Sequence, residues 1–303
     1  MIVVEAAGRD EFLALMQETY GSAMSAAEFD WWFERNPTGP RLISLVESDG
    51  RVACASAMSF LPMRLGGSAT PVAFAVHAAT HPDFRGQGIW PRLELHNEEE
   101  AAREAPIVLG FTNPVAGPIL VGKLGWRDLA RLRIWAAPLR PAGRARGVAE
   151  LERFGSDTDA VYERLAGFWP AHVVRRSEHL NWRFVDSERS YRRFAAVRGG
   201  AVVGWAAVGT ATYGGRRVAV VADLVSPSFG VTRSLLAACK RASSGVQAIV
   251  ALVSRGERAA FASSLFVPTH KSIRFIGKRL HDDAPLPEGR DAWRFTLGDL
   301  DIF

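Results

Sequence analysis

The sequence has few of the residues that mark disulfide scaffolds, metal sites or membrane spans. Its 303 residues include two cysteines, Cys54 and Cys239, far apart and in apolar surroundings. They exclude a disulfide framework and a Cys-x-x-Cys site, and they predict buried thiols in a cytoplasmic protein. No apolar run reaches the roughly 18 residues that a membrane span needs. No basic segment precedes an apolar one at the N-terminus, so we expect no signal peptide and no membrane partner.

Lysine is also scarce, because four of the 37 basic residues are lysines and the rest are arginines. The net charge is +5 at pH 7, but the arginines are spread along the chain except in the stretch 140–146. Nucleic-acid-binding proteins concentrate their basic residues on one face or helix. We therefore expect a solvated arginine-rich surface and no nucleic-acid partner, and nucleic-acid binding is an alternative that rests on charge alone. A ligand that carries phosphate, such as a nucleotide cofactor or a sugar nucleotide, agrees with the same charge.

The most informative segment is Thr80-His81-Pro82-Asp83-Phe84-Arg85-Gly86-Gln87-Gly88. It follows an apolar run, residues 71–79, and precedes a helical pattern that begins near Ile89. A strand that ends in an Arg-Gly-x-Gly turn and opens into a helix presents free backbone N–H groups at the positive end of the helix dipole. Glycine permits positive φ angles and a close approach of the backbone. The segment therefore predicts a phosphate or pyrophosphate site, with an unrelated glycine turn as the alternative.

A second set of features follows in order. Residues 107–111 read as a short buried strand, Asn113 comes next, and a further segment ends in Lys123-Leu124-Gly125-Trp126. The ordered set of turn, helix, strand, Asn and Leu-Gly-aromatic resembles the acyl-CoA-binding region of the GNAT (Gcn5-related N-acetyltransferase) superfamily. Arg85 and Gly88 match its loop pattern, whereas Trp90 stands where the family has a small residue.

The resemblance implies that acetyl-CoA, or another acyl-CoA, is the cofactor. It also implies that the strand before the turn separates from its neighbour, so that its backbone groups contact the pantetheine arm. The cofactor-binding residues that we then expect are His77, Ala78, Ala79, Thr80, Arg85, Gly86, Gln87, Gly88, Ile89, Trp90 and Asn113.

The same order of features occurs twice along the chain. Each half has an aromatic pair, two strands joined by a turn that contains glycine, a proline after a further strand, and an aromatic residue near its end. The corresponding residues lie 151, 150, 145 and 140 positions apart: Trp31 and Trp182, Gly50 and Gly200, Pro82 and Pro227, Trp126 and Phe266. A nearly constant offset predicts a duplicated domain with shortened loops, and chance recurrence of strand–turn–strand is the alternative.

We therefore expect an α+β, three-layer fold with two tandem GNAT-like domains, each a mixed, mostly antiparallel sheet flanked by helices. Residues 1–142 would form the acyl-CoA-binding domain. Residues 148–303 would form a degenerate copy that supplies the acceptor pocket or support, because the segment after Pro227 lacks the Arg-Gly-Gln-Gly turn. The stretch 140–147, rich in Pro, Gly and Arg, is the expected linker.

Other patterns predict local structure. Ser25 is the expected N-cap of a helix over residues 26–35. A run of glutamates in the helix after the turn predicts a solvated face: Glu94, Glu98, Glu99 and Glu100. Four tryptophans are expected in the core: Trp31, Trp32, Trp182 and Trp205.

The catalytic residues are not determined by the sequence. Many GNAT enzymes have a tyrosine acid two positions before the Lys-Leu-Gly-aromatic run, and Val121 occupies that place. The leaving thiolate must then be protonated by another group, by water, or not at all. As bases we consider His77, with strand alternation turning it away from the substrate as the alternative, and His81. Asp299 and Asp301 are further candidates, with a solvated tail as the alternative.

The sequence thus predicts an acyl-CoA-dependent N-acyltransferase, and most simply an N-acetyltransferase, that acts on the primary amine of a small molecule such as an amino sugar or sugar nucleotide. The alternative is a catalytically weak acyl-CoA-binding or sensing protein. We expect a cytoplasmic monomer or homodimer, and the acceptor, the acyl chain and any ligand of the second half stay open.

Overall fold

The computed structural model describes residues 2–5, 8–21, 24–140, 144–213 and 215–300. The chain divides into two compact units that are not contiguous in sequence. Unit 1 consists of Met1–Ala130 and Arg274–Glu288, and unit 2 consists of Arg131–Ile273 and Gly289–Phe303. These ranges differ from the expected division between residues 142 and 148. Part of the expected linker, residues 141–143, lies outside the described residues.

Unit 1 is built on a mixed sheet whose strands follow the order β1, β2, β3, β4, β5 and the end of β13. Antiparallel pairing joins β1 to β2, β2 to β3 and β3 to β4, whereas β4 and β5 are parallel. The strands are β1 (Ile2–Glu5), β2 (Leu42–Ser48), β3 (Arg51–Leu65), β4 (Ser68–Thr80), β5 (Ile107–Thr112) and β13 (Val267–Arg279). The turn between β2 and β3 has positive φ at Asp49 (54°) and Gly50 (72°), as the Asp-Gly pair predicts.

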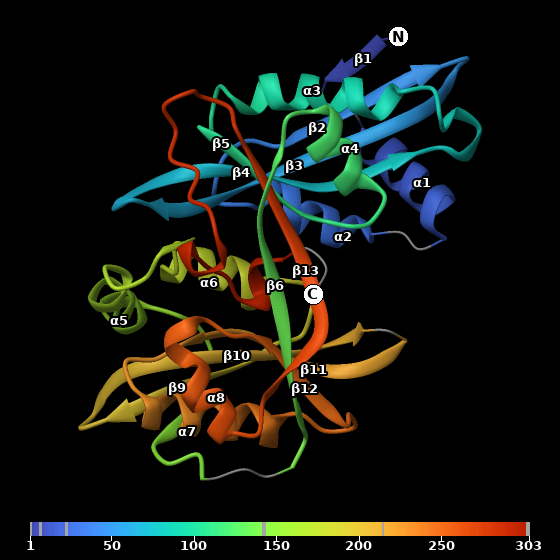
Figure 1. Cartoon of the computed structure of the whole chain (residues 1–303). Helices are drawn as coiled ribbons and strands as arrows, with labels where there is room; N and C mark the ends of the chain where they lie inside the picture. Colours follow the sequence, from blue (N-terminus) through green and yellow to red (C-terminus); the bar gives the residue numbers. More distant parts are fainter. Residues whose placement is uncertain (1, 6–7, 22–23, 141–143, 214, 301–303) are drawn as a thin grey trace. The chain divides into compact units, whose positions relative to one another are not determined.

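Helices cover both faces of this sheet (Figure 1). One face carries α3 (Ile89–Ala101), which packs on β2 and β3, and the other carries α1 (Arg9–Tyr20) and α2 (Ala26–Phe29). Ser25 caps α2 as expected, because its hydroxyl accepts the Glu28 N–H at 3.0 Å. The predicted single helix over 26–35 instead changes at Asp30 into a π-helical turn, Asp30–Glu34. The last helix, α4 (Ala116–Lys123), follows β5.

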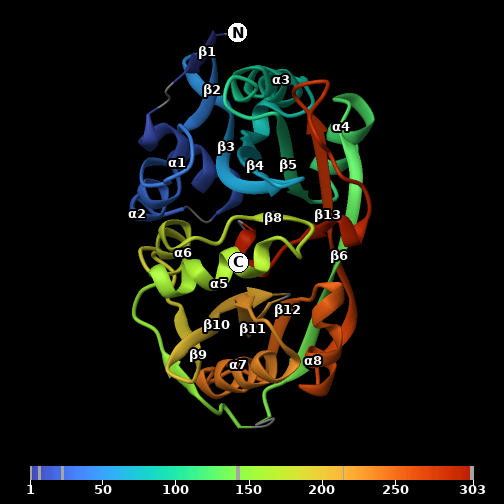
Figure 2. The ribbon, with the colours of Figure 1, turned by 90° about the vertical axis from the view of Figure 1, so that its left-hand side faces the viewer.

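Unit 2 has the same kind of sheet, with β6, β12, β11, β10, β9 and β7 in that order. It is covered by α5 and α6 on one face and by α7 on the other (Figure 2). The strands are β6 (Arg127–Pro138), which begins in unit 1, β7 (Val148–Glu150), β9 (Arg192–Arg198), β10 (Ala201–Tyr213), β11 (Arg216–Val225) and β12 (Ala248–Leu252). The helices are α5 (Ser156–Ala166), α6 (Ser177–Phe184), α7 (Phe229–Ala242) and α8 (Arg258–Ser263). A further pair of short parallel strands joins β8 (Ala171–Val173) to β14 (Trp293–Arg294).

The two halves of the sequence exchange one strand each. In unit 1, the strand antiparallel to β5 is the end of β13, from Arg274 to Arg279. In unit 2, the strand antiparallel to β12 is the end of β6, from Ile134 to Pro138. Each sheet is therefore completed by the other half of the chain, which explains why the compact units are discontinuous in sequence.

Two local irregularities recur in both halves. The register of β3 and β4 shifts between Ser56 and Met58, and that of β10 and β11 shifts between Ala207 and Val208, one strand before each proline turn. Gly125 has φ +76°, and Leu265, the residue 140 positions later, has φ +68°. A leucine seldom adopts this left-handed backbone, so the shared conformation supports the predicted correspondence between the two segments.

The predicted α+β class is confirmed, because both units are mixed sheets with helices on both faces. The four tryptophans Trp31, Trp32, Trp182 and Trp205 are buried, as predicted, and so are the thiols of Cys54 and Cys239. Among the described residues, none of the helices is both long enough and apolar enough to span a membrane.

Candidate functional site

The β4 strand has an open edge just before the glycine turn. Its parallel pairing with β5 runs from Ala73 to Ala75 and ends opposite Gly110. In the described part of the chain no pairing with β5 continues over residues 76–80, although β4 itself continues to Thr80. The expected separation of the two strands is therefore observed.

The ladder between β3 and β4 determines which groups face this edge. The His81 N–H donates to the carbonyl of Ala53 at 2.9 Å. Hydrogen-bonded and non-hydrogen-bonded pairs alternate along an antiparallel ladder. The pairs of Thr80 with Cys54 and of Ala78 with Ser56 are therefore non-hydrogen-bonded pairs. The N–H and C=O groups of Ala78 and Thr80 therefore point away from β3, toward the open edge.

The turn that follows the open edge leads into an uncapped helix. Gly86 and Gly88 have φ angles of +79° and +69°, and a Cβ at either position would meet no heavy atom within 4 Å. Gly88 is the N-cap of α3, and no side chain within the described residues caps this helix. The side chain of Arg85 folds back, its Nε donating to the Thr80 carbonyl at 3.2 Å. The first turn of α3 thus has donors and open space for an anion.

Tyr20 reaches the same edge from the last residue of α1. Its hydroxyl donates to the carbonyl of Ala78 at 2.5 Å. Burial of the hydroxyl raises the pKa of Tyr20, whereas the positive charge of Arg85 acts in the opposite direction. Nothing in the local sequence pattern indicates that a helix 58 positions earlier ends beside β4, so this residue is not predictable from the sequence alone.

The side chains of both histidine candidates contact neighbouring residues of unit 1. His81 is buried, its Nδ1 accepts the Asp83 N–H at 3.2 Å, and its Nε2 lies 2.8 Å from Glu18 Oε1. It therefore caps the short turn Pro82–Phe84. The His77 ring makes edge contacts with the aromatic rings of Trp32 and Phe33, with centroids 6.4 and 6.3 Å apart.

Asn113 and Val121 are tied to α4 and its surroundings. The Asn113 Oδ1 accepts the N–H groups of Val115 and Ala116, both at 2.9 Å, and thus holds the turn before α4. Val121 packs against the hydrophobic cluster that contains Leu120 and Trp126.

The glutamates of α3 differ from the prediction of a solvated face. Glu94 and Glu98 are 1% and 4% exposed, so the prediction is wrong for both of them. Glu94 accepts the Ser56 hydroxyl at 2.8 Å, and burial raises the pKa of its carboxyl to about 7. Glu98 accepts the Trp126 indole N–H at 2.6 Å and pairs with Lys278. Glu94 and Glu98 thus attach the buried face of α3 to β3, Trp126 and β13.

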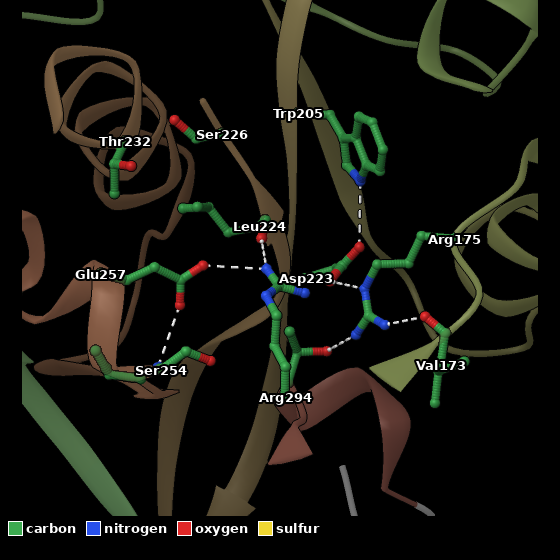
Figure 3. Close-up of polar contacts among 12 residues, drawn as sticks. Val173, Arg175, Trp205, Asp223, Leu224, Ser226, Thr232, Ser254, Glu257 and Arg294 are labelled. Carbon is green, nitrogen blue, oxygen red and sulfur yellow. Dashed lines mark hydrogen bonds and ion pairs between the residues drawn. The ribbon is translucent and has the colours of Figure 1, made fainter. Parts of the chain in front are cut away.

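The corresponding edge in unit 2 is filled by the chain itself (Figure 3). Pairing between β11 and β12 is described only for Ala219 and Val220, so β11 also extends beyond its partner. The Leu224 carbonyl there accepts Nη2 of the buried Arg294 at 2.6 Å, and the same nitrogen lies 3.0 Å from Glu257 Oε1. The guanidinium stacks on Trp169, 4.0 Å from its ring centre.

The N-terminus of α7 in unit 2 is capped by a side chain. The Ser228 hydroxyl accepts the Val231 N–H at 3.4 Å and so caps the helix. The segment after Pro227 therefore lacks both the glycine turn and the uncapped helix of unit 1.

Asp299 belongs to a buried charge cluster in unit 2. Arg175 donates from Nε to Asp223 at 3.0 Å, and Trp205 donates to Asp223 at 3.2 Å (Figure 3). Arg175 also donates from Nη2 to Asp299 at 2.6 Å. Burial alone would raise the pKa of Asp223, but the Arg175 guanidinium holds it below the usual value. The Asp299 carboxylate is thus committed to holding the C-terminal segment, which is not a solvated tail at this residue. Asp301 lies outside the described residues.

In the parts of the chain that the structure describes, no group of three or more His, Cys, Asp or Glu side chains is placed to hold a metal ion. The features that unit 1 does bring together are an open strand edge, a glycine turn and an uncapped helix start. All three lie within residues 76–92.

Comparison with known proteins agrees with this geometry. Residues 3–128 match the family model of the acetyltransferase (GNAT) domain. No curated protein matches the sequence significantly.

Solved structures share the fold at low sequence identity. A GCN5-related N-acetyltransferase from Anabaena variabilis ATCC 29413 superposes with a TM-score of 0.69 and 13% identity, over 92% of this chain and 73% of that one. A GCN5-related N-acetyltransferase from Kribbella flavida gives 0.65 and 18%, over 92% and 72%. A putative acetyltransferase from Pyrococcus horikoshii gives 0.64 and 15%, over 99% and 94%. Residues 3–128 are therefore a GNAT acetyltransferase domain, and the fold along most of the chain is shared with GCN5-related N-acetyltransferases.

Proposed function

We propose that the protein is an acyl-CoA-dependent N-acyltransferase, with acetyl-CoA as the simplest donor, and that unit 1 binds the acyl-CoA. The observation that carries the proposal is the continuity of the open edge of β4 with the glycine turn and the uncapped start of α3. An acyl-CoA has a long arm with amide groups and a pyrophosphate at its far end. A strand edge followed by an anion site suits these two parts in that order.

The residues of unit 1 fit such a ligand. The backbone N–H groups of Ala78 and Thr80 would bind the arm, because they point toward the open edge while the two carbonyls accept Tyr20 and Arg85. Gly86, Gly88 and the first turn of α3 would hold the pyrophosphate, because the space beside both glycines is open. Arg85 would add positive charge once its side chain leaves the Thr80 carbonyl.

The bound acyl-CoA would supply an activated thioester, and the protein would place an amine against it. Positioning alone accounts for much of such a rate, since effective molarities of about 10⁵ M or more are available to well-oriented reactants. The acceptor that we propose is the primary amine of a small molecule, such as an amino sugar or a sugar nucleotide. The arginine-rich composition is consistent with an acceptor that carries phosphate.

We further propose that unit 2 is a degenerate copy of the same domain and binds no acyl-CoA. Support comes from Arg294, a buried side chain that takes the Leu224 carbonyl at the counterpart edge, whereas the side chains on the β4 carbonyls, Tyr20 and Arg85, are exposed. Further support comes from Ser228, which caps α7. The matching strand order, register shifts and left-handed residues of the two units support the duplication.

The experiment has two steps. Calorimetry with CoA tests for one site per chain, and release of the CoA thiol from acetyl-CoA is then measured with glucosamine, glucosamine 1-phosphate, a polyamine and a peptide amine. Turnover with one of the amino sugars supports the full proposal. CoA binding without turnover on any amine favours the alternative of a binding or sensing protein, and the absence of CoA binding overturns the proposal.

A further inference from the structure

The open edge of β4 carries a phenol that the sequence pattern does not indicate. Tyr20 is the last residue of α1 and is 61% exposed, and Gly21 (φ +69°) ends the helix directly after it. Its hydroxyl lies 2.5 Å from the Ala78 carbonyl, on the strand edge that faces away from β3. The Tyr20 hydroxyl therefore lies beside the strand edge along which the proposed function places the acyl-CoA arm.

The other titratable side chains near this edge are committed elsewhere. The buried Cys54 thiol lies 3.4 Å from the Thr80 hydroxyl, and burial raises its pKa to about 11. His81 is bound to Glu18 and to the Asp83 N–H. Val121, at the position where the family resemblance leads one to expect an acid, packs into the core.

We propose that Tyr20 is the catalytic acid of the transfer, presented by α1 in place of an acid on α4. The inference rests on the proposed function. In the step, the acceptor nitrogen forms a bond with the thioester carbon and the carbon–sulfur bond breaks. The electron pair left on sulfur takes the phenolic proton, the nitrogen releases one proton to solvent, and the exposed tyrosinate recovers one from water.

The surroundings of Tyr20 suit this role. The ordinary pKa of a tyrosine, about 10, keeps the phenol protonated at neutral pH. Partial burial raises the pKa of Tyr20 further. The charge of Arg85, which favours the ionised form, would stabilise the tyrosinate after the proton has left. The hydrogen bond to the Ala78 carbonyl holds the hydroxyl at the strand edge before the reaction, and the O–H turns from this carbonyl to the sulfur when it gives up its proton.

The test compares the native protein with Tyr20→Phe and with Tyr191→Phe, a control in unit 2 whose ring packs on Phe184. We expect Tyr20→Phe to lower kcat at least tenfold with KM for acetyl-CoA changed less than threefold, because general acid catalysis is worth about 10² or more. The native rate should fall at alkaline pH, and this limb should be absent in Tyr20→Phe. Tyr191→Phe should behave as the native protein.

A readout without turnover completes the test. Tyrosinate absorbance is titrated with and without CoA, and CoA should shift the titration of one tyrosine in the native protein but none in Tyr20→Phe. An unchanged kcat and pH profile in Tyr20→Phe, an effect confined to KM, or no CoA-dependent shift would overturn the inference while leaving the proposed function in place. If the native protein does not bind CoA, the proposed function itself fails.

Discussion

Lys278 pairs with Glu98, a residue 180 positions earlier in the chain, and thereby attaches the exchanged strand β13 to helix α3. Glu98 is buried, and its second oxygen accepts the indole N–H of Trp126 at 2.6 Å. The helix whose first turn forms the proposed anion site is therefore held by Trp126 and Lys278, residues from the two halves of the sequence.

Lys278→Met should destabilise the protein by about 2 kcal/mol, because the buried Glu98 carboxylate then keeps only the Trp126 indole N–H as a donor. The lysine is partly exposed, so the expected cost is below that of breaking a fully buried pair. Urea unfolding measures the change. Lys271→Met, at an exposed position of the same strand, is the matched control and should leave the midpoint nearly unchanged. Equal midpoints for the two variants would show that the pair does not support α3.

Leu265→Gly should stabilise the protein by roughly 0.5–1 kcal/mol, since a left-handed backbone costs leucine about 1–2 kcal/mol and glycine's greater freedom in the unfolded chain offsets part of the gain. The side chain is 49% exposed, so little burial is lost. Leu265→Ala keeps the unfavourable φ and should not stabilise. The thermal midpoints of the three proteins check the order, and a lower midpoint for the glycine variant than for the alanine variant contradicts it.

Glu94→Gln should remove a pH dependence of stability. Burial raises the pKa of the Glu94 carboxyl from 4.5 to about 7, so the native state binds more protons than the unfolded state between these values. The contribution of Glu94 is present in full below pH 4.5 and is lost as the pH rises through about 7, which amounts to roughly 3 kcal/mol. Unfolding in urea at pH 5 and at pH 7.5 measures the slope. Glu99→Gln, on the exposed side of α3, should keep the pH dependence of the unfolding free energy. If the pH dependence also persists in Glu94→Gln, another group is responsible.

The sequence predicted the parts of the fold that local rules govern. The glycine turn, the positive φ angles at Asp49 and Gly50, and the Ser25 cap follow from short-range chemistry and are observed. The prediction of a solvated face for Glu94 and Glu98 in α3 was wrong, although the spacing of the residues in the sequence indicates a buried face. Glu94, Glu98 and the apolar residues of the helix recur three and four positions apart, so they share one buried face.

The strand exchange and the position of Tyr20 could not be predicted in the same way. The pairing of β5 with the end of β13 joins segments that no local pattern relates, because any strand of suitable composition satisfies the same edge. Tyr20 reaches Ala78 only because α1 packs on β3 and β4. Both depend on long-range packing.

Arg175→Met should destabilise unit 2 by about 3–5 kcal/mol, because the buried Asp223 and Asp299 then lose their shared cation. Arg153→Met, which breaks an exposed pair with Asp186, should cost at most about 1 kcal/mol. Hydrogen exchange of the amides in β10 and β11 localises the effect. Similar losses in both variants would contradict the structural role given to the buried cluster.

The most direct test of acyl-CoA binding by unit 1 is calorimetry with CoA on the native protein, Gly88→Val and Gly230→Val. Gly88 has φ +69° at the uncapped start of α3, whereas Gly230 lies in the first turn of the capped helix α7. We predict one site per chain, at least tenfold weaker binding in Gly88→Val, which is about 1.4 kcal/mol, and native affinity in Gly230→Val. Two sites per chain, or unchanged affinity in a correctly folded Gly88→Val protein, would contradict the assignment.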